Sequence, residues 1–457
     1  MADTKITALT ALTAADPAND VIPIVDVSDT SMAASGTTKK ISVNNILGAS
    51  GTATLASAAI TGAATVGTTL VVTGKVTANT NIEITRGLLN DGTSTGVGAT
   101  ALAATTAGAT GNTALGYRAM YQATTGANNV AVGINSLSAA SMTGSGNVAI
   151  GQLAASALTT GSSNVFIGDT VAFNSAITAS DCIAIGQNSM RSASAISGAN
   201  NIGIGKDTFR NLSSGLSNVA IGRESANQLT TGQTNTYVGA AAGYNNLTGD
   251  NNVGIGFQAL VAATVSSLTA VGSNALVSNT SGANNTAVGR SALAAVVTTS
   301  NNTALGYLAG NATTGGDTTA IGSNALALST GGNQNTAVGS NAMGSAIVTG
   351  GFNTAIGVST GFSLTSGTSN TFLGTEAGLN TTIGSSNICI GRGAVSAATD
   401  SNVIAIGSST YYVGTNGAAN TYFTTATALS TGTLPLTCGF LRVIINGTAR
   451  KIAVYAD

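Results

Sequence analysis

One serine stands between two glycines at the spacing that some hydrolases use for their nucleophile. Ser94 follows Gly92 and precedes Gly96, the pattern of a sharp turn that exposes a hydroxyl between a strand and a helix. The sequence contains no histidine, so the usual base that would take the serine proton is missing. The surrounding residues are a Gly/Thr-rich linker, and we expect no catalysis at this serine.

Carboxylates could cleave polysaccharide as a pair or bind calcium in a repetitive protein. Glu224 and Glu376 are the only glutamates between residues 98 and 407 and are far apart in sequence, which argues against a pair. The aspartates of this region recur without a fixed position: Asp169, Asp181, Asp207, Asp250, Asp317 and Asp400. Without histidine, zinc and iron would also lack their common ligand. We predict no catalytic residue, no metal site and no cofactor, and therefore a protein that is not an enzyme.

Two glycine pairs could suggest a phosphate-binding loop. Gly203 with Gly205, and Gly254 with Gly256, neither complete the dinucleotide-binding pattern nor precede a plausible helix. We interpret them as glycines of a repeat.

Three cysteines are spread widely along the chain, at Cys182, Cys389 and Cys438. Cys389 takes a position that alanine holds in neighbouring repeats. We therefore expect all three to be small buried thiols rather than nucleophiles or ligands.

The elements that would carry these residues come from a repeat of about 17 residues. We call the glycine that closes each repeat the repeat glycine. These glycines follow one another without a gap: Gly116, Gly133, Gly151, Gly168, Gly186, Gly205, Gly222, Gly239, Gly256, Gly272, Gly289, Gly306, Gly322, Gly339, Gly357, Gly374, Gly391 and Gly407. Two β-branched or aliphatic residues precede each glycine at period-2 spacing, as Val130 and Val132 do, which predicts a short strand. One repeat cannot bury its apolar residues alone, so we predict stacked coils that form an all-β parallel β-solenoid.

Other columns of the repeat have their own predicted roles. An asparagine four residues before most glycines, such as Asn129, would cap the turn that enters each strand. A small-large pair three and four residues after the glycine, such as Ala119 and Met120, looks like a second short strand. The residue between the two β-branched ones is usually alanine and points the opposite way, toward something that approaches closely.

Three aromatic residues replace that alanine, at Phe166, Tyr237 and Phe372. Exposed Thr, Asn and aromatic side chains could touch sugars. We favour the alternative that these three rings fill gaps between chains.

Composition limits the choice of partners. The formal net charge is -1 and 7% of the residues are charged, so there is no electrostatic case for binding nucleic acid or an anionic membrane. No apolar run reaches the roughly 18 residues of a membrane span. Residues 1–19 lack a basic start and an apolar core, so we expect no signal peptide, no membrane insertion and assembly in a cytoplasm.

The N-terminal part resembles a known family. Residues 1–50 contain Lys5-Ile-Thr-Ala-Leu-Thr-Ala-Leu, then Val21-Ile-Pro-Ile-Val-Asp-Val, then Gly36-Thr-Thr-Lys-Lys-Ile-Ser-Val. These stretches resemble the N-terminal segment of tailed-bacteriophage fibre proteins, which implies attachment to other virion proteins. In residues 51–97, Val, Ile, Leu and Thr alternate between glycines, a pattern of short strands and tight turns. This part is similar to the β-rich shafts of the same family, which are usually intertwined trimers.

The array of residues 98–407 is similar to the head repeat of trimeric autotransporter adhesins, on its Asn-x-Val/Thr-Ala-Ile/Val-Gly motif. That resemblance implies a left-handed, β-roll-like solenoid in an intertwined homotrimeric fibre, with the alanine column facing neighbouring chains near a threefold axis. The same motif occurs in phage fibres. The longer repeat, and the lack of a signal peptide or C-terminal anchor pattern, favour the phage family.

Residues 408–457 differ from the array. Asn446-Gly447 lies between two apolar runs and predicts a β-hairpin. We expect a β-rich module that caps the open end of the solenoid, similar to the endings of phage structural proteins.

Together these patterns predict a virion fibre, specifically a tail fibre that binds a host-surface glycan or protein receptor without catalysis. A capsid-mounted decoration fibre and a glycan-cleaving tailspike are the alternatives. The chain would be assembled in the host cytoplasm and reside in the virion.

Overall fold

The computed structural model describes residues 93–103, 109–173 and 176–407 and, as backbone strands, residues 409–415, 421–425, 439–445 and 448–454. The predicted attachment segment, 1–50, and most of the predicted shaft lie outside the described residues. The chain divides into two units, Met1–Ile82 and Glu83–Asp457. All of the described residues belong to the second unit.

Nineteen three-residue strands, β1 to β19, form the array. They are β1 (Thr95–Val97), β2 (Thr113–Leu115), β3 (Val130–Val132), β4 (Val148–Ile150), β5 (Val165–Ile167), β6 (Ile183–Ile185), β7 (Ile202–Ile204), β8 (Val219–Ile221), β9 (Thr236–Val238), β10 (Val253–Ile255), β11 (Thr269–Val271), β12 (Thr286–Val288), β13 (Thr303–Leu305), β14 (Thr319–Ile321), β15 (Thr336–Val338), β16 (Thr354–Ile356), β17 (Thr371–Leu373), β18 (Ile388–Ile390) and β19 (Ile404–Ile406). Four longer strands follow: β20 (Ser409–Thr415), β21 (Thr421–Thr425), β22 (Gly439–Ile445) and β23 (Thr448–Val454).

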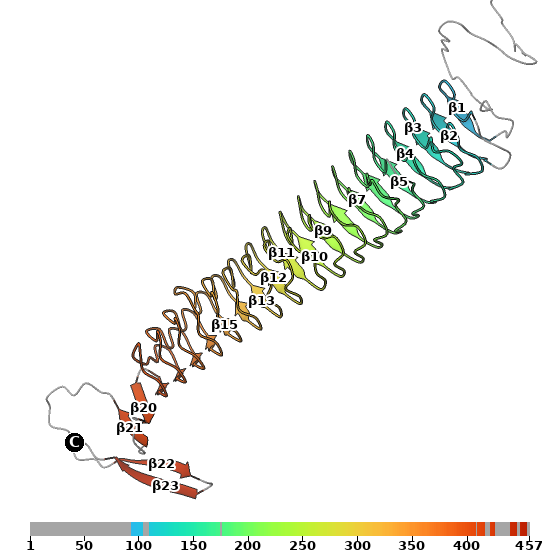
Figure 1. Cartoon of the computed structure of the whole chain (residues 1–457). Helices are drawn as coiled ribbons and strands as arrows, with labels where there is room; N and C mark the ends of the chain where they lie inside the picture. The colour runs from blue at the N-terminus through green and yellow to red at the C-terminus, as the bar shows by residue number, and fades with distance from the viewer. Residues whose placement is uncertain are drawn as a thin grey trace, which may run out of the picture. The chain divides into compact units, whose positions relative to one another are not determined.

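Each short strand pairs in parallel with the strand of the next coil, and equivalent positions stay in register. In β12 and β13, for example, Thr286 lies beside Thr303 and Ala287 beside Ala304. Changes in repeat length therefore fall in the turns and leave the strands aligned. Figure 1 shows the result within the array, a single stack of coils with the short strands along one side. The predicted β-solenoid is confirmed, with about 18 turns and a repeat of about 17 residues. The described residues contain no helix, and hence none that could cross a bilayer.

The middle residue of each strand points into the interior of its own coil. Ala131, between Val130 and Val132, is fully buried, while the two valines are partly exposed. The same buried-middle pattern holds from β2 through β19. Our prediction that the alanine column faces neighbouring chains is therefore wrong. The alanines belong to the core of a single chain, where the walls of the coil approach closely enough to need a small side chain.

The aromatic residues that replace alanine also point inward. Phe166, Tyr237 and Phe372 are at most 1% exposed. For two of the rings the space comes from glycines: a Cβ at Gly243 would lie 2.4 Å from the Tyr237 ring, and one at Gly378 would lie 2.5 Å from the Phe372 ring. The prediction that these rings fill gaps between chains is wrong, because each fills the interior of its own coil.

The predicted second strand is a turn. Ala119 and Met120 are adjacent in sequence, and both are fully buried, which the alternation of a β-strand does not allow. Arg118 and Met120 both have left-handed φ angles, 54° and 51°, and this backbone directs the pair to the same side. Successive turns still bond to each other, since the Met120 N–H donates to the Ser136 carbonyl at 2.9 Å.

The repeat glycines lie at the corner between strand and turn. Gly289 has a φ of 133°, and a Cβ there would lie 2.3 Å from the carbonyl oxygen of Gly306 in the next coil. Only glycine can adopt this conformation at such a close approach. The regular recurrence of glycine therefore has a steric cause.

The C-terminal end of the array is covered by a strand that runs the other way. β20 pairs antiparallel with β19, and β21 pairs antiparallel with β20. β22 and β23 form the predicted hairpin around residues 446–447. Because β20 occupies the edge of β19, the parallel stack does not end in an open strand.

Candidate functional site

A buried column of asparagines runs through the coils at the predicted position, but these side chains bond mostly to neighbouring coils and so form a ladder, where the sequence predicts caps on the turn of their own coil. The side-chain Oδ1 of Asn129 accepts hydrogen bonds from the backbone N–H of Asn147 at 2.8 Å and from its Nδ2 at 3.0 Å. The Nδ2 of Asn129 donates to the Gly144 carbonyl at 3.0 Å and to Oδ1 of Asn112 at 3.2 Å. The ladder asparagines are fully buried, and among the described residues none of their side-chain oxygen or nitrogen atoms lacks a hydrogen-bond partner. The ladder joins coils and leaves no group for a ligand.

Three other residue types interrupt the ladder, and a fourth, Val403, ends it by donating its backbone N–H to Oδ1 of Asn387 at 2.9 Å. Cys182, Leu268 and Thr318 stand in its column, and each donates its backbone N–H to the asparagine before it, at 2.9 to 3.1 Å. They end the chain of side-chain amides without leaving that asparagine unpaired.

Both described cysteines are free and buried, which bears out the expectation for Cys182 and Cys389, while Cys438 lies outside the described residues. Burial raises the pKa of both thiols. A protonated, buried thiol is a poor nucleophile and a poor ligand, so these cysteines serve as core residues.

Ser94 takes the ladder position of the first coil. It is 1% exposed, and its hydroxyl accepts the Asn112 backbone N–H at 3.1 Å and donates to the Ala109 carbonyl at 3.4 Å. A nucleophilic serine needs its hydroxyl presented to substrate. The hydroxyl of Ser94 instead fixes the start of the ladder.

The two glutamates of the array do not meet. Glu224 follows β8 and Glu376 follows β17, nine coils apart, or roughly 43 Å at about 4.8 Å per coil. Paired glycosidase carboxylates lie within about 10 Å of each other. Within the described residues, no three histidine, cysteine, aspartate or glutamate side chains lie close enough to hold a metal ion.

The glycine pairs are repeat features, as interpreted. Gly203 and Gly254 are the inward middle residues of β7 and β10. They make room for Phe209 and Tyr237, whose rings lie 3.0 and 2.9 Å from where a Cβ would stand. Gly205 and Gly256 are repeat glycines, which lie at the corner between strand and turn.

The outward face of the strands is uncharged along the array, with an aliphatic residue at the third position of every strand and threonine at the first position of ten strands. We call β1 to β19 the strand wall. None of its residues is charged, and threonine is its only polar type apart from the buried tyrosine Tyr237 and the buried thiol of Cys389. Aliphatic side chains at the third strand position are between 36% and 55% exposed, namely Val97, Leu115, Ile150, Ile204, Ile221, Ile255, Leu305, Ile356, Leu373, Ile390 and Ile406. Contiguous apolar surface of this kind marks an interaction site.

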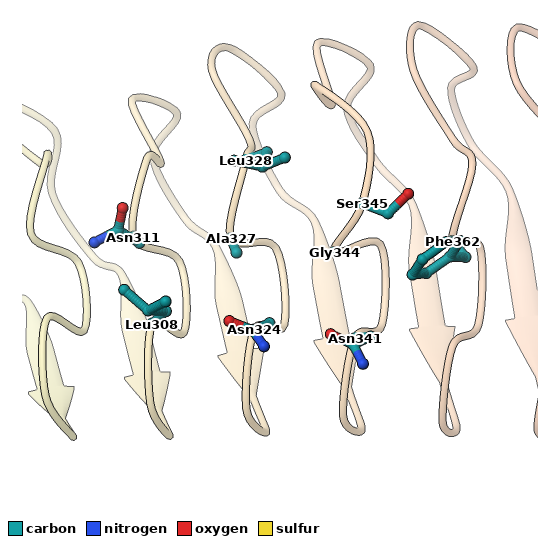
Figure 2. A pocket seen from close by; sticks show the side chains of 9 residues that line it. All are labelled: Leu308, Asn311, Asn324, Ala327, Leu328, Asn341, Gly344, Ser345 and Phe362. Carbon is teal, nitrogen blue, oxygen red and sulfur yellow. The ribbon is translucent and has the colours of Figure 1, made fainter.

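The opposite side of each coil is built from turns. We call the five residues that begin two after each repeat glycine the turn wall, for example residues 324–328. This wall holds a cavity of about 390 Å³ lined by Leu308, Asn311, Asn324, Ala327, Leu328, Asn341, Gly344, Ser345 and Phe362. Figure 2 shows these side chains spread over neighbouring coils, with Asn324 and Asn341 side by side and Phe362 at one end.

Arginines lie over exposed aromatic rings elsewhere on the turns. The guanidinium of Arg118 is 5.4 Å from the ring centre of Tyr117 and 5.0 Å from that of Tyr121. Arg290 is 5.6 Å from the ring of Tyr307 in the next coil. Such cation–π contacts satisfy the arginines locally.

Sequence reasoning missed both candidate surfaces. It assigned the alanines, and not their aliphatic neighbours, to contacts between chains, although the β-branched pairs flanking each alanine were visible. The cavity could have been suspected from the small residues Ala327 and Gly344 in one column. That these residues lie together on one side of the solenoid can be recognised only once the turn geometry is known.

Comparison of the chain with protein-family models, with curated proteins and with solved structures finds no match.

Proposed function

We propose that this chain is a structural fibre of a tailed-bacteriophage virion, a tail fibre that adheres to the host surface without catalysis and assembles as a homotrimer. The proposal combines the fibre-like motifs of the sequence with two physical properties of the array, its regular stacking and its apolar strand wall.

The apolar strand wall carries the proposal. An uncharged face that leaves one aliphatic side chain per coil about 40% exposed along much of the array, as Ile255 and Ile356 are, is stabilised when it is covered. A partner with the same repeat spacing can cover it over its whole length. Two further copies of this chain satisfy that condition and close around a threefold axis. The inward alanines then belong to each chain's own core, and the aliphatic residues belong to the trimer.

The interior of each coil supports a mechanical role. Successive coils are joined by the asparagine ladder and by in-register strands, so bending or sliding would break buried hydrogen bonds. A stiff rod can transmit contact between a host surface and a particle. In this proposal residues 1–50 bind other virion proteins, and the receptor is a glycan or protein of the host surface.

The geometry gives less support to a glycan-cleaving spike, because the two array glutamates are nine coils apart. A capsid-mounted fibre would use the same trimeric array, and only its attachment point would differ.

A pair of matched variants tests the trimer. Ile221→Asp combined with Ile255→Asp places two charges on the strand wall, whereas Leu247→Asp charges an aliphatic residue that is 46% exposed in a turn. We expect sedimentation equilibrium to give a trimer for the wild type and for Leu247→Asp, and a monomer with an unchanged circular dichroism spectrum for the double variant. A monomeric wild-type chain would overturn the proposed assembly.

Cryo-electron microscopy of native particles tests the location. Trimeric rods rooted at the tail would support the proposal, and rods on the capsid shell would replace it with the decoration fibre. Release of reducing sugar from host polysaccharide by the purified chain would overturn the non-catalytic role.

A further inference from the structure

We propose that the cavity in the turn wall binds a neutral sugar unit through the amides of Asn324 and Asn341 and the ring of Phe362. The inference rests on the proposed adhesive function only for the source of the sugar, a glycan of the host surface. The chemistry of the cavity itself is independent of that source.

The cavity exists because one column of side chains changes size. The fifth residue after each repeat glycine is Asn311, Ala327, Gly344 and Phe362 in four successive coils. The two small residues lie between two larger ones, so the gap extends over two coils and is closed at both ends. Gly344 cannot be enlarged without movement, since a Cβ there would lie 2.4 Å from the carbonyl oxygen of Asn324. The opening is therefore built into the backbone.

Two amides are held at a fixed spacing beside this opening. Asn324 and Asn341 occupy the same position in consecutive coils, both with a left-handed φ of 55°. Their backbone N–H groups donate to Tyr307 and Ser323 in the preceding coils at 2.8 and 2.9 Å, which fixes both residues in place. Each side-chain amide offers donors and an acceptor. Two such amides about 4.8 Å apart can each bind one of two adjacent hydroxyls on a sugar ring.

The remaining lining provides apolar contact. Phe362 stands at one end of the cavity and Leu308 at the other, with Leu328 above (Figure 2). The C–H face of a sugar packs against aromatic and aliphatic surface while its hydroxyls bond to amides. A few polar groups in a mainly apolar cavity of about 390 Å³ match the small end of the usual range for ligand sites.

The absence of charge among the nine lining residues selects for neutral ligands. An acidic sugar would lose hydration of its carboxylate on entering the cavity and meet no cation in return. A neutral hexose or N-acetylhexosamine unit has no such cost. The charge of the sugar is thus the feature on which the cavity discriminates.

The cavity stays open in the proposed trimer. Its lining residues all lie in turns between β13 and β17, and none belongs to a strand. The buried residues Ala337 of the strand wall and Met343 of the turn wall lie in the core, so the strands face one side and the cavity another. Covering the strand wall would leave the cavity in contact with solvent.

Saturation-transfer NMR on the purified full chain tests the inference. The probes are the methyl glycosides of glucose, galactose, mannose and N-acetylglucosamine, with methyl glucuronide as the charged comparison. We expect saturation transfer to at least one neutral glycoside and none to the glucuronide. In Asn324→Ala, and in Phe362→Leu, the affinity should fall about tenfold, the effect of losing one well-placed contact.

Asn274→Ala is the matched control. Asn274 has the same place in its coil and nearly the same φ, 58°, but lies outside the cavity, so its substitution should leave glycoside binding unchanged. Transfer to no neutral glycoside, transfer equal for the glucuronide, or binding unaffected by Asn324→Ala would each overturn the inference. Adsorption of the wild type and of Asn324→Ala to host cells separates this result from the proposed function. If both proteins adsorbed equally and neither bound a glycoside, sugar binding in the cavity would be refuted while the proposed fibre function would stand. If neither protein adsorbed to host cells, the adhesive role would be refuted.

Discussion

The strand wall and the turn wall enclose one core but bury their residues in different ways. In the strand wall one residue in three points inward, as Ala287 does between Thr286 and Val288. In the turn wall two adjacent residues point inward together, as Ala292 and Leu293 do, with Leu293 at a φ of 50°. The strand wall therefore leaves aliphatic side chains exposed in many of its coils, whereas the turn wall exposes mostly polar residues, with Leu328 as an aliphatic exception.

This difference suits the two walls to different roles, the strand wall to contact with a partner and the turn wall to variation in loop length and residue size. The strand wall is uncharged and repetitive, which suits contact with another repetitive surface. The turn wall tolerates changes in loop length and residue size, because its coils are aligned by the strands and the ladder. A cavity such as that between Asn311 and Phe362 can form in the turn wall without disturbing the stack.

The largest expected effect is at the corner where the two walls meet. Gly289→Ala forces a Cβ to within 2.3 Å of the Gly306 carbonyl oxygen at a φ of 133°, and should destabilise the neighbouring coils by about 3 kcal/mol or more. Native-state hydrogen exchange should show faster exchange on both walls of these coils, since the corner joins them.

Gly331→Ala is the control for this substitution. Nothing lies within 4 Å of a Cβ at Gly331, which has no left-handed φ, so its exchange pattern should match that of the wild type. If the exchange pattern of Gly289→Ala also matched that of the wild type, the corner glycine would not be what holds the strand wall and the turn wall together.

The next largest effect should come from an asparagine of the buried ladder, Asn218, when it is compared with an asparagine of the turn wall, Asn274. Asn218→Ala removes the acceptor of the Asn235 backbone N–H at 2.9 Å and a donor to the Gly232 carbonyl at 2.8 Å. Leaving such groups buried and unpaired should cost about 2–3 kcal/mol. Asn274→Ala in the turn wall should cost about 1 kcal/mol, mostly from its left-handed φ. Urea denaturation of both variants measures the difference, and equal losses would mean that the ladder adds nothing beyond backbone geometry.

The sequence predicts the parts of this fold that depend on periodicity. The strands, their parallel stacking, the column of asparagines and the C-terminal hairpin all follow from spacing and residue type, whereas the hydrogen bonds that link asparagines of successive coils were not predicted. The direction of the alanines does not, because a period of two tells which residues share a face but not which face is inside. The Ala119–Met120 pair was mistaken for a strand because small-large alternation does not reveal the left-handed φ of Met120.

The candidate surfaces were less predictable than the fold. The absence of paired glutamates and of histidine could be read directly from the sequence, and so could the repeat origin of Gly203 and Gly254. The cavity depends on residues such as Asn311 and Phe362, which are separated by several coils and come together only through stacking.

A smaller, stabilising effect should come from a buried residue that directly follows the turn wall. Asn279 is fully buried, and within the described residues neither its Nδ2 nor its Oδ1 has a hydrogen-bond partner. Leu229 and Leu364 hold the same place in their coils, seven residues after the repeat glycine. Asn279→Leu should therefore raise stability by about 1–2 kcal/mol, because an unpaired buried amide is replaced by an apolar side chain. Thermal unfolding by calorimetry measures the gain, and a lower melting temperature would indicate a bound water or other partner at Asn279.

The smallest effect concerns pH and acts on one wall only. The buried groups with raised pKa values are Tyr237 and Cys389, inward residues of β9 and β18, and Cys182, next to β6; burial is the main cause in each case. A pKa raised by folding means that the neutral form is favoured in the native state. The resulting stability is complete below the unfolded pKa, about 8.5 for cysteine and 10 for tyrosine, and is lost as pH rises above it.

Alkaline pH should therefore loosen the strand wall before the turn wall. We expect the melting temperature to be constant up to about pH 8 and to fall above it, with a smaller fall in Cys389→Ala, which introduces the residue most common in that column. Tyr237→Phe also removes the hydroxyl that accepts a hydrogen bond from Nδ2 of Asn246 at 2.6 Å, so its melting temperature should differ from that of the wild type by a constant amount up to about pH 10, and this difference should change only above that pH. Because the described turn-wall core contains no titratable side chain with a shifted pKa, hydrogen exchange from Met343 and its neighbours should follow intrinsic base catalysis alone. Equal extra exchange in both walls would show that the coil opens as one unit and that the two walls are not separable.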